Sequence, residues 1–330
     1  MHMADALLNP QVSGAMYVCS AAVGAYSINK IRNIHEPEKI PVMGVMSAFV
    51  FATQMINFTI PGTGSSGHLC GGMLLTALLG PEAGFVSMIG VLLIQCLLFA
   101  DGGLMALGAN VWNMAFYSCF VGGYLIWRLI MKNGMTKTKI IAASILGSVL
   151  TLQLGAFSVT LETLVSGVSE LPFAVFVSVM QPIHLAIGFV EGIITAAVLV
   201  FVYQTNPDLL WCNSDEQEEK ISLKKLISIL GAMAAVIGGL LSLLASGFPD
   251  GLEWSMEKVA GTSELAREGS VYSFAEKIQG ITALMPDYSI AGGSEEIGTS
   301  FSGIIGGLIV IGVCVAACYG LKMFKKERNE

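Results

Sequence analysis

Apolar stretches alternate with short polar connections along most of this chain of 330 residues. Most of these stretches are long enough to cross the roughly 30 Å hydrocarbon core of a membrane as helices. The stretch at 68–80 is shorter, and we expect it to be buried among other helices. We predict nine membrane-embedded segments, at 12–31, 41–60, 68–80, 84–100, 104–131, 139–165, 173–204, 223–246 and 301–321. The pattern therefore predicts an all-α, polytopic membrane helical bundle.

The placement of basic residues orients this bundle. With the N-terminus outside and each segment crossing once, 14 of the 17 Lys and Arg residues fall in inside loops. The other three, Lys258, Arg267 and Lys277, share one longer outside loop. Because cytoplasmic loops carry an excess of Lys and Arg, we expect an external N-terminus. The same alternation places residues 61–68 outside, on the side of Met1 and His2.

A polar run at 206–222 divides the chain, and we expect it to be a cytoplasmic linker. A seven-segment unit at 1–205 precedes it, and a two-helix unit at 223–330 follows, with an outside loop at 247–300. Glycine pairs recur within the expected spans, and we interpret them as close helix contacts. The pairs are Gly71-Gly72, Gly102-Gly103, Gly122-Gly123 and Gly306-Gly307.

Composition supports a multi-pass membrane protein. Hydrophobic residues make up 54% of the chain and charged residues 12%, with a mean hydropathy of +0.71, far from the values of a soluble domain. We expect no nucleic-acid partner and no cleavable signal peptide, since no basic segment precedes a short apolar core. The seven cysteines form no Cys-x-x-Cys pair, so neither a disulfide framework nor a cysteine-rich zinc site is predicted.

The chain begins Met1-His2, which sets an α-amine, an amide nitrogen and an imidazole side by side. If the amide loses its proton, these three nitrogens can close two fused chelate rings on one metal ion. They fill three corners of a square and leave the fourth for another nitrogen. Square-planar nitrogen ligation suits Ni(II) or Cu(II). Initiator Met is usually kept before a residue as bulky as His2, but most chains that begin this way bind nothing there.

His68 follows the run Pro61-Gly-Thr-Gly-Ser-Ser-Gly67 and is expected on the same face as His2. It can supply the missing fourth nitrogen, although a helix-capping turn with an incidental His also explains the run. A ligating imidazole usually has its other nitrogen held by a further polar group. The candidates near the outer face are Asp5, Asn57, Ser65, Ser66, Asp101 and Asn110, and spacing alone does not choose between them.

The two remaining histidines have simpler interpretations. His35 is expected in the first inside loop beside Glu36, in contact with solvent. His184 lies within the seventh span, with Glu191 two turns further on. A buried ionisable residue in a span is a functional candidate, but for His184 we favour helix–helix hydrogen bonding over metal contact.

Several motifs, taken in order, resemble the substrate-capturing component of cobalt and nickel energy-coupling-factor transporters, the CbiM/NikM type. The resemblance covers about 1–204. It rests on Met1-His2-Met3-Ala4-Asp5, Gly62-Thr63-Gly64-Ser65-Ser66-Gly67-His68-Leu69, Leu79-Gly80-Pro81, Asp101-Gly102-Gly103-Leu104, Leu107-Gly108-Ala109-Asn110, Asn113-Met114, and His184-Leu185-Ala186-Ile187-Gly188 with Glu191-Gly192. The chain departs from the family at Met3-Ala4-Asp5-Ala6, where Ile and Pro-Asp-Gly are common.

The resemblance implies that Met1, His2 and His68 supply the metal ligands. It also implies ATP-binding subunits and a transmembrane coupling subunit as partners in a prokaryotic cell membrane. The C-terminal part resembles the small accessory component of such transporters, through Pro249-Asp250-Gly251-Leu252-Glu253. Pro-Asp-Gly is a strong turn signal, so we interpret this motif as a turn that docks on the capture unit, with contact to the metal path as the alternative.

Nickel is the favoured substrate, with cobalt as the alternative. Four nitrogens in a plane suit low-spin Ni(II), whereas Co(II) more readily takes six-coordinate or tetrahedral sites. The cobalt branch also tends to have His-Gly-Gly where this chain has Asp101-Gly102-Gly103.

Two other classes of function remain open. A membrane enzyme is disfavoured, because the chain has no His-Glu-x-x-His and no pair of aspartates within its spans. The other is a structural or assembly protein whose N-terminus is incidental.

Overall fold

The computed structural model describes residues 1–32, 39–213, 221–289 and 295–327. His35 lies outside these residues, as does the acidic part of the expected linker. Each of the nine predicted segments contains a helix. These are α1 (Pro10–Arg32), α2 (Lys39–Gln54), α3 (Gly72–Leu79), α4 (Pro81–Phe99), a helix over 107–131, α7 (Lys137–Val165), α8 (Phe173–Thr205), α9 (Leu223–Gly239) and α12 (Glu295–Glu327).

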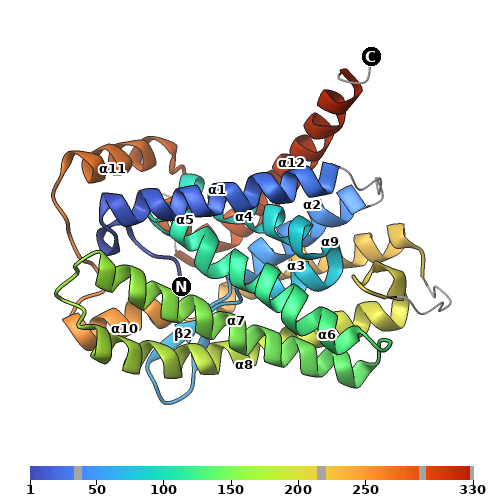
Figure 1. Cartoon of the computed structure of the whole chain (residues 1–330), viewed down its shortest axis with the longest axis horizontal. Helices are drawn as coiled ribbons and strands as arrows, with labels where there is room; N and C mark the ends of the chain where they lie inside the picture. The colour runs from blue at the N-terminus through green and yellow to red at the C-terminus, as the bar shows by residue number, and fades with distance from the viewer. Residues whose placement is uncertain (33–38, 214–220, 290–294, 328–330) are drawn as a thin grey trace.

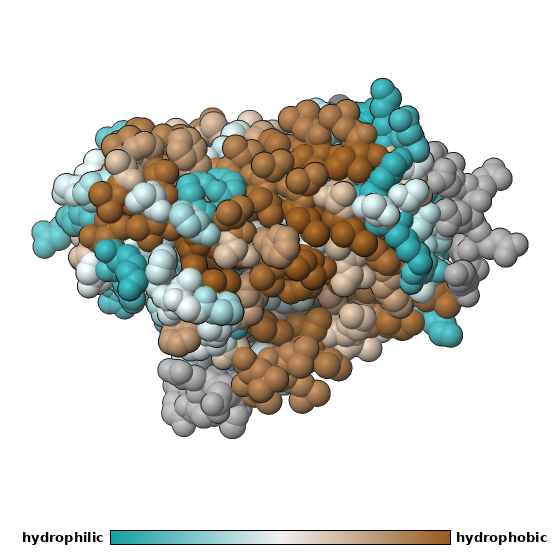
Figure 2. All heavy atoms as spheres, turned by 90° about the horizontal axis from the view of Figure 1, so that it is seen from below, coloured by the Kyte–Doolittle hydropathy of each residue, from teal (hydrophilic) through white to brown (hydrophobic). Residues whose placement is uncertain are grey.

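Among the described residues, five helices are long and apolar enough to cross a membrane. They are Pro81–Phe99, Leu107–Met131, Lys137–Val165, Phe173–Thr205 and Gly298–Ala316. Apolar side chains form a broad band across the middle of the face in Figure 2, with hydrophilic residues gathered toward the ends. The protein is therefore a multi-pass membrane protein, whereas the full count of nine membrane segments stays a prediction.

The helix over 107–131 is continuous but not uniform. It begins as α5 (Leu107–Asn110), winds as a π-helix through η2 (Val111–Trp127) and ends as α6 (Arg128–Met131). The amide of Arg128 donates to the carbonyl of Gly123, five residues earlier. Such wide turns are rare and are often found near functional sites.

The prediction of an all-α chain omits a short hairpin. β1 (Phe58–Ile60) pairs antiparallel with β2 (Ser65–Gly67), and Phe58 lies opposite Gly67. The expected segments 41–60 and 68–80 are therefore shorter as helices, ending at Gln54 and beginning at Gly72. α3 has only eight residues and all of them are buried, as its predicted burial among other helices requires.

Close glycine contacts join the helices where the sequence suggested them, with one exception. A Cβ added to Gly122 would lie 2.3 Å from Sδ of Met73, and one on Gly306 would lie 2.2 Å from Cζ of Phe51. Gly102 and Gly103 instead lie in the loop between α4 and α5, against residues of the N-terminal segment. The interpretation of that pair as a helix contact was wrong, because the helix before it ends at Phe99.

The expected outside loop at 247–300 contains helices of its own. These are α10 (Gly251–Ala260), α11 (Ser270–Thr282) and the short turn η5 (Pro286–Tyr288). α10 and α11 lie at one end of the molecule in Figure 1, whereas α6 and the end of α8 lie toward the other. The N-terminus lies within the outline of the bundle, and the side chain of Met1 is 5% exposed.

Candidate metal centre

The first residues of the chain are anchored inside the protein. The amide of Met3 donates to Oδ1 of Asn110 at 2.8 Å, and Nδ2 of Asn110 donates to the carbonyl of Met3 at 3.2 Å. The amide of Gly103 donates to the same carbonyl at 2.9 Å. These three hydrogen bonds fix the backbone next to Met1 and His2, so the two residues have a defined position.

Asp5 binds the same N-terminal segment to the loop before α5. It begins the short turn η1 (Asp5–Leu7), and its Oδ1 accepts a hydrogen bond from the amide of Ala106 at 3.0 Å. Burial raises the pKa of its carboxyl, while hydrogen bonds from Ala106 and Met105 act in the opposite direction. Asp5 and Asn110 therefore position the backbone of the N-terminal segment.

His68 follows β2 directly and points toward the N-terminus. Its Nδ1 lies 3.0 Å from the carbonyl oxygen of Leu69. Because a carbonyl can only accept, Nδ1 carries the hydrogen and Nε2 presents its lone pair. Nε2 lies 3.0 Å from the α-amine nitrogen of Met1. Two of the predicted donor nitrogens thus meet in the folded chain.

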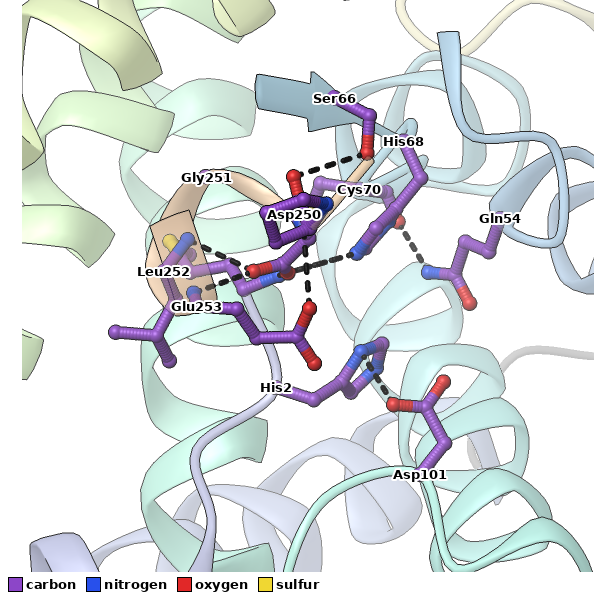
Figure 3. A network of polar contacts seen from close by, with 12 residues as sticks. His2, Gln54, Ser66, His68, Cys70, Asp101, Asp250, Gly251, Leu252 and Glu253 are labelled. Carbon is purple, nitrogen blue, oxygen red and sulfur yellow. Dashed lines mark hydrogen bonds and ion pairs between the residues drawn. The ribbon is translucent and has the colours of Figure 1, made fainter. Parts of the chain in front are cut away.

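Asp250 is the third group at this point, and it comes from the C-terminal domain (Figure 3). Its Oδ2 forms an ion pair with the Met1 amine and lies 3.7 Å from Nε2 of His68. Burial alone would raise the pKa of the Asp250 carboxyl, but the positive charge of the Met1 amine holds it well below its usual range. Asp250 is therefore an ionised carboxylate facing two donor nitrogens.

The same side chain also begins α10. Oδ1 of Asp250 accepts hydrogen bonds from the amides of Leu252 and Glu253, at 2.8 and 2.9 Å. The Glu253 carboxylate accepts in return from the amide of Asp250 at 3.1 Å. This reciprocal pair is a capping box. The motif therefore begins a helix, and Asp250 also contacts the Met1 amine; its contact with a metal path stays a prediction.

The His2 ring lies beside His68 but faces other partners. The two rings stack with centroids 5.3 Å apart and planes at 18°. Nδ1 of His2 lies 3.1 Å from Oδ1 of Asp101, and Nε2 lies 3.2 Å from Oε1 of Gln95. Burial lowers the pKa of His2 to about 4, although Asp101 acts in the opposite direction. The ring is therefore neutral at pH 7 and available as a ligand.

The other candidate polar residues connect the two domains. Oγ of Ser66 donates to the carbonyl of Phe248 at 2.7 Å, and its amide donates to that of Pro249 at 2.8 Å. Oγ of Ser65 donates to the carbonyl of Ser66, and the carbonyl of Asn57 accepts from the amide of Ser246. Among the six candidates, Asp101 is the one that contacts a predicted ligand ring.

The C-terminal domain covers the N-terminal segment at further points. Oη of Tyr272 donates to the carbonyl of Leu8 at 2.8 Å, and Nε2 of Gln279 donates to that of Gly102 at 2.9 Å. The hydroxyl of Tyr288 donates to Asp101, which in turn faces His2. Residues of both domains thus surround the candidate metal centre.

Sequence reasoning missed Gln95 and the capping role of Asp250 and Glu253. Gln95 is an uncharged polar residue inside an apolar span, and Nε2 of Gln95 is held by Oε1 of Gln54 at 2.8 Å. Its position within a span was the available signal. The spacing Asp-x-x-Glu in Asp250-Gly-Leu-Glu253 was the signal for the cap.

Side chains alone do not make this a metal site. Within the part of the chain that the structure describes, no three His, Cys, Asp or Glu side chains come together as metal ligands. The predicted ligand set differs from such a cluster, because it includes the Met1 amine and the His2 amide.

The family model for the cobalt uptake substrate-specific transmembrane region, CbiM, matches residues 2–209. The chain belongs to the CbiM family. A second family model, the PDGLE domain, matches residues 224–323. This CbiM-family chain therefore carries a PDGLE domain after its first membrane unit.

Known relatives share one or both of these parts. The putative fused nickel transport protein NikMN of Archaeoglobus fulgidus is 35% identical and covers 94% of this chain and 96% of its own length. The cobalt transport protein CbiM of Geobacter sulfurreducens is 30% identical and covers 64% of this CbiM-family chain and 61% of its own. A crystal structure of a truncated transition metal transporter matches with a TM-score of 0.54 and 31% identity, covering 62% of this chain and 99% of that one.

Proposed function

We propose that the protein is the substrate-binding component of an ATP-driven importer for Ni²⁺. In this proposal four nitrogens hold the ion: the Met1 amine, the His2 amide and ring, and Nε2 of His68. The observation that carries the proposal is the 3.0 Å separation between the Met1 amine and Nε2 of His68. With metal–nitrogen distances of roughly 2.0 Å, two adjacent corners of a square are about 2.8 Å apart. The two nitrogens therefore already lie near the spacing that neighbouring ligands need.

Binding in this way requires three local changes. The ion replaces the amine proton that Met1 donates to Asp250, and the amide of His2 also loses its proton. Nδ1 of His2 now faces Asp101, so the ring must turn for that nitrogen to join the amine and amide in fused chelate rings. Turning the ring leaves the backbone in place, because Asn110 and Gly103 hold Met3.

Nickel is preferred to cobalt on two grounds. Four nitrogens in a plane suit Ni(II) better than Co(II). The fused relative that matches both domains is named for nickel, whereas the relative named for cobalt covers 64% of this chain. Cobalt remains the alternative substrate, and competition between the two ions at equal concentration measures the preference.

Partner subunits are part of the proposal. The sequence has no Gly-x-x-x-x-Gly-Lys-Ser/Thr phosphate loop, so ATP is assigned to separate subunits, joined through a membrane-embedded coupling subunit. Vesicles that contain this chain alone should take up no Ni²⁺ in response to ATP. ATP-dependent uptake by the chain alone would contradict this assignment.

The test is equilibrium Ni²⁺ binding to the purified protein and to His68→Ala. Loss of one nitrogen from a four-nitrogen site should weaken binding by about 100-fold or more, because loss of an outer-shell partner alone typically costs about 10–100-fold in metal affinity. His35→Ala, which removes an imidazole from a predicted inside loop, is the matched control and should bind as tightly as the native chain. Unchanged affinity in His68→Ala would refute the four-nitrogen site.

A further inference from the structure

His184 presents an unused nitrogen inside the protein. Its side chain is 1% exposed, and Nδ1 lies 2.8 Å from the carbonyl oxygen of Met180, one turn earlier in α8. Since that carbonyl can only accept, Nδ1 carries the hydrogen and Nε2 carries the lone pair. Nε2 is buried, and it has no hydrogen-bond partner within the residues that the structure describes. The expected helix–helix hydrogen bond of His184 is therefore not formed.

The ring borders a small cavity next to the metal centre. This cavity measures about 10 Å³ and is lined by His184, Met1, His68, Cys70 and Asp250, among others. A volume of this size holds roughly one water molecule or one ion. Gly251 keeps the ring accessible, since a Cβ there would lie 3.1 Å from Cε1 and 3.4 Å from Nε2 of His184.

The orientation of the ring is the one found in metal-ligating histidines. Such a residue usually donates from one ring nitrogen to a backbone carbonyl or carboxylate and binds the metal through the other. Two sulfur-containing residues, Cys70 and Met114, line the same cavity, and the Cys70 thiol donates to the carbonyl of Met114 at 3.2 Å. Imidazole with sulfur suits late transition metals, and the Asp250 carboxylate supplies negative charge beside a cation.

We propose that Nε2 of His184 is an inner ligand for a divalent transition-metal ion, forming a second position next to the four-nitrogen site. The ion would pass to this position as it leaves Met1 and His68. The inference rests on the proposed function and adds a step to it. Within the described residues no three His, Cys, Asp or Glu side chains are assembled here, so the second position should bind more weakly than the first.

The experiment is a Ni²⁺ titration of the full chain in detergent, measured by calorimetry. The amount of bound metal is then determined after dialysis. Two substitutions remove the nitrogen: His184→Phe fills a similar volume, and His184→Gln keeps a polar group. Leu152→Ile, at another residue lining the cavity, is the matched control. The native chain and Leu152→Ile should bind one ion tightly and a second more weakly. Both His184 variants should weaken the second by tenfold or more and leave the first within about twofold.

Three results would overturn the inference. One is a single bound ion in the native chain, and another is a second ion that binds equally well in both His184 variants, as expected if the cavity holds only water. The third is loss of both ions in both variants, which would make His184 part of the framework. The proposed function fails separately, if adding three glycines before Met1 leaves the tight ion in place.

Discussion

The α-amine of Met1 lies 3.0 Å from Nε2 of His68, although 67 positions separate the two residues in the sequence. The contact depends on three elements that meet at one point. The loop between α4 and α5 holds Met3, the hairpin of β1 and β2 presents His68, and the start of α10 brings Asp250 to both nitrogens. Changes in any of these elements should alter metal binding, even where no ligand is removed.

A substitution at Gly103 tests whether the loop between α4 and α5 positions the metal site. A Cβ at this position would lie 1.8 Å from Oδ1 and 2.4 Å from the amide nitrogen of Asp5, so Gly103→Ala must displace the N-terminal segment. We expect Ni²⁺ affinity to fall by at least about tenfold, together with a loss of stability of roughly 1–3 kcal/mol, the usual cost of overpacking. Gly14→Ala is the control, because an added Cβ there meets no atom within 4 Å. Equal affinity in the two variants would show that the loop does not position the site.

Two substitutions at Asp250 distinguish its role as a helix cap from its role in an ion pair. Asp250→Asn should keep the cap of α10, since Asn caps helices as well as Asp, but it removes the charge that faces the Met1 amine. Asp250→Ala should lose both and cost about 1 kcal/mol more, the typical value of an N-cap. Thermal unfolding of the metal-free protein measures the order of stability. The native chain should have the highest melting temperature, Asp250→Asn a lower one and Asp250→Ala the lowest. Asn and Ala variants of equal stability would contradict the capping role.

The pH dependence of this ion pair has a defined sign. The pKa of Asp250 in the folded protein is held well below its ordinary value of 3.8. Its contribution to stability is therefore fully present above about pH 4 and is lost as the pH falls through the lowered pKa. The stability difference between the native chain and Asp250→Asn should be constant from about pH 5 to 6 and shrink below pH 4. A difference that grows on acidification would contradict the ion pair.

Metal affinity should fall as the pH is lowered from about 8 to 6. The amine and the His2 amide must both lose protons on binding, so protons compete with the ion. The His2 ring does not contribute in this range, because burial lowers its pKa to about 4. We expect a loss of about tenfold or more per pH unit in Ni²⁺ titrations. Affinity that is constant from pH 6 to 8 would exclude amide ligation.

Much of the fold is encoded in local hydrophobic pattern. Apolar stretches as long as those of α7 and α8 have few alternatives to a membrane helix, and the structure has helices there within two residues of the predicted bounds. The hairpin of β1 and β2 was not predicted, because three-residue strands leave almost no periodic signal. The helices of the expected outside loop were not predicted. Pro249-Asp250-Gly251 is a strong turn signal, and it overlaps the Asp-x-x-Glu spacing that begins α10.

The site was predictable only in part. Met1 and His2 are adjacent in sequence, so their ability to chelate follows from covalent structure. The hairpin brings His68 to the amine, whereas metal binding by these residues stays a prediction. The contact between Met1 and Asp250 spans 249 positions and depends on how the PDGLE domain packs on the first unit. The free nitrogen of His184 depends on which ring atom meets the carbonyl of Met180, and no sequence pattern encodes that choice.

The most direct test of the account is the visible spectrum of the Ni²⁺-loaded protein, compared with a variant that has three glycines inserted before the Met1-His2 pair. The native chain should give a yellow, diamagnetic Ni(II) species, as four nitrogens in a plane require. Three inserted residues move the α-amine too far from His2 for fused chelate rings, so this species should disappear. The same three glycines added after Glu330 should change nothing. A spectrum that survives insertion before Met1 would contradict the four-nitrogen site.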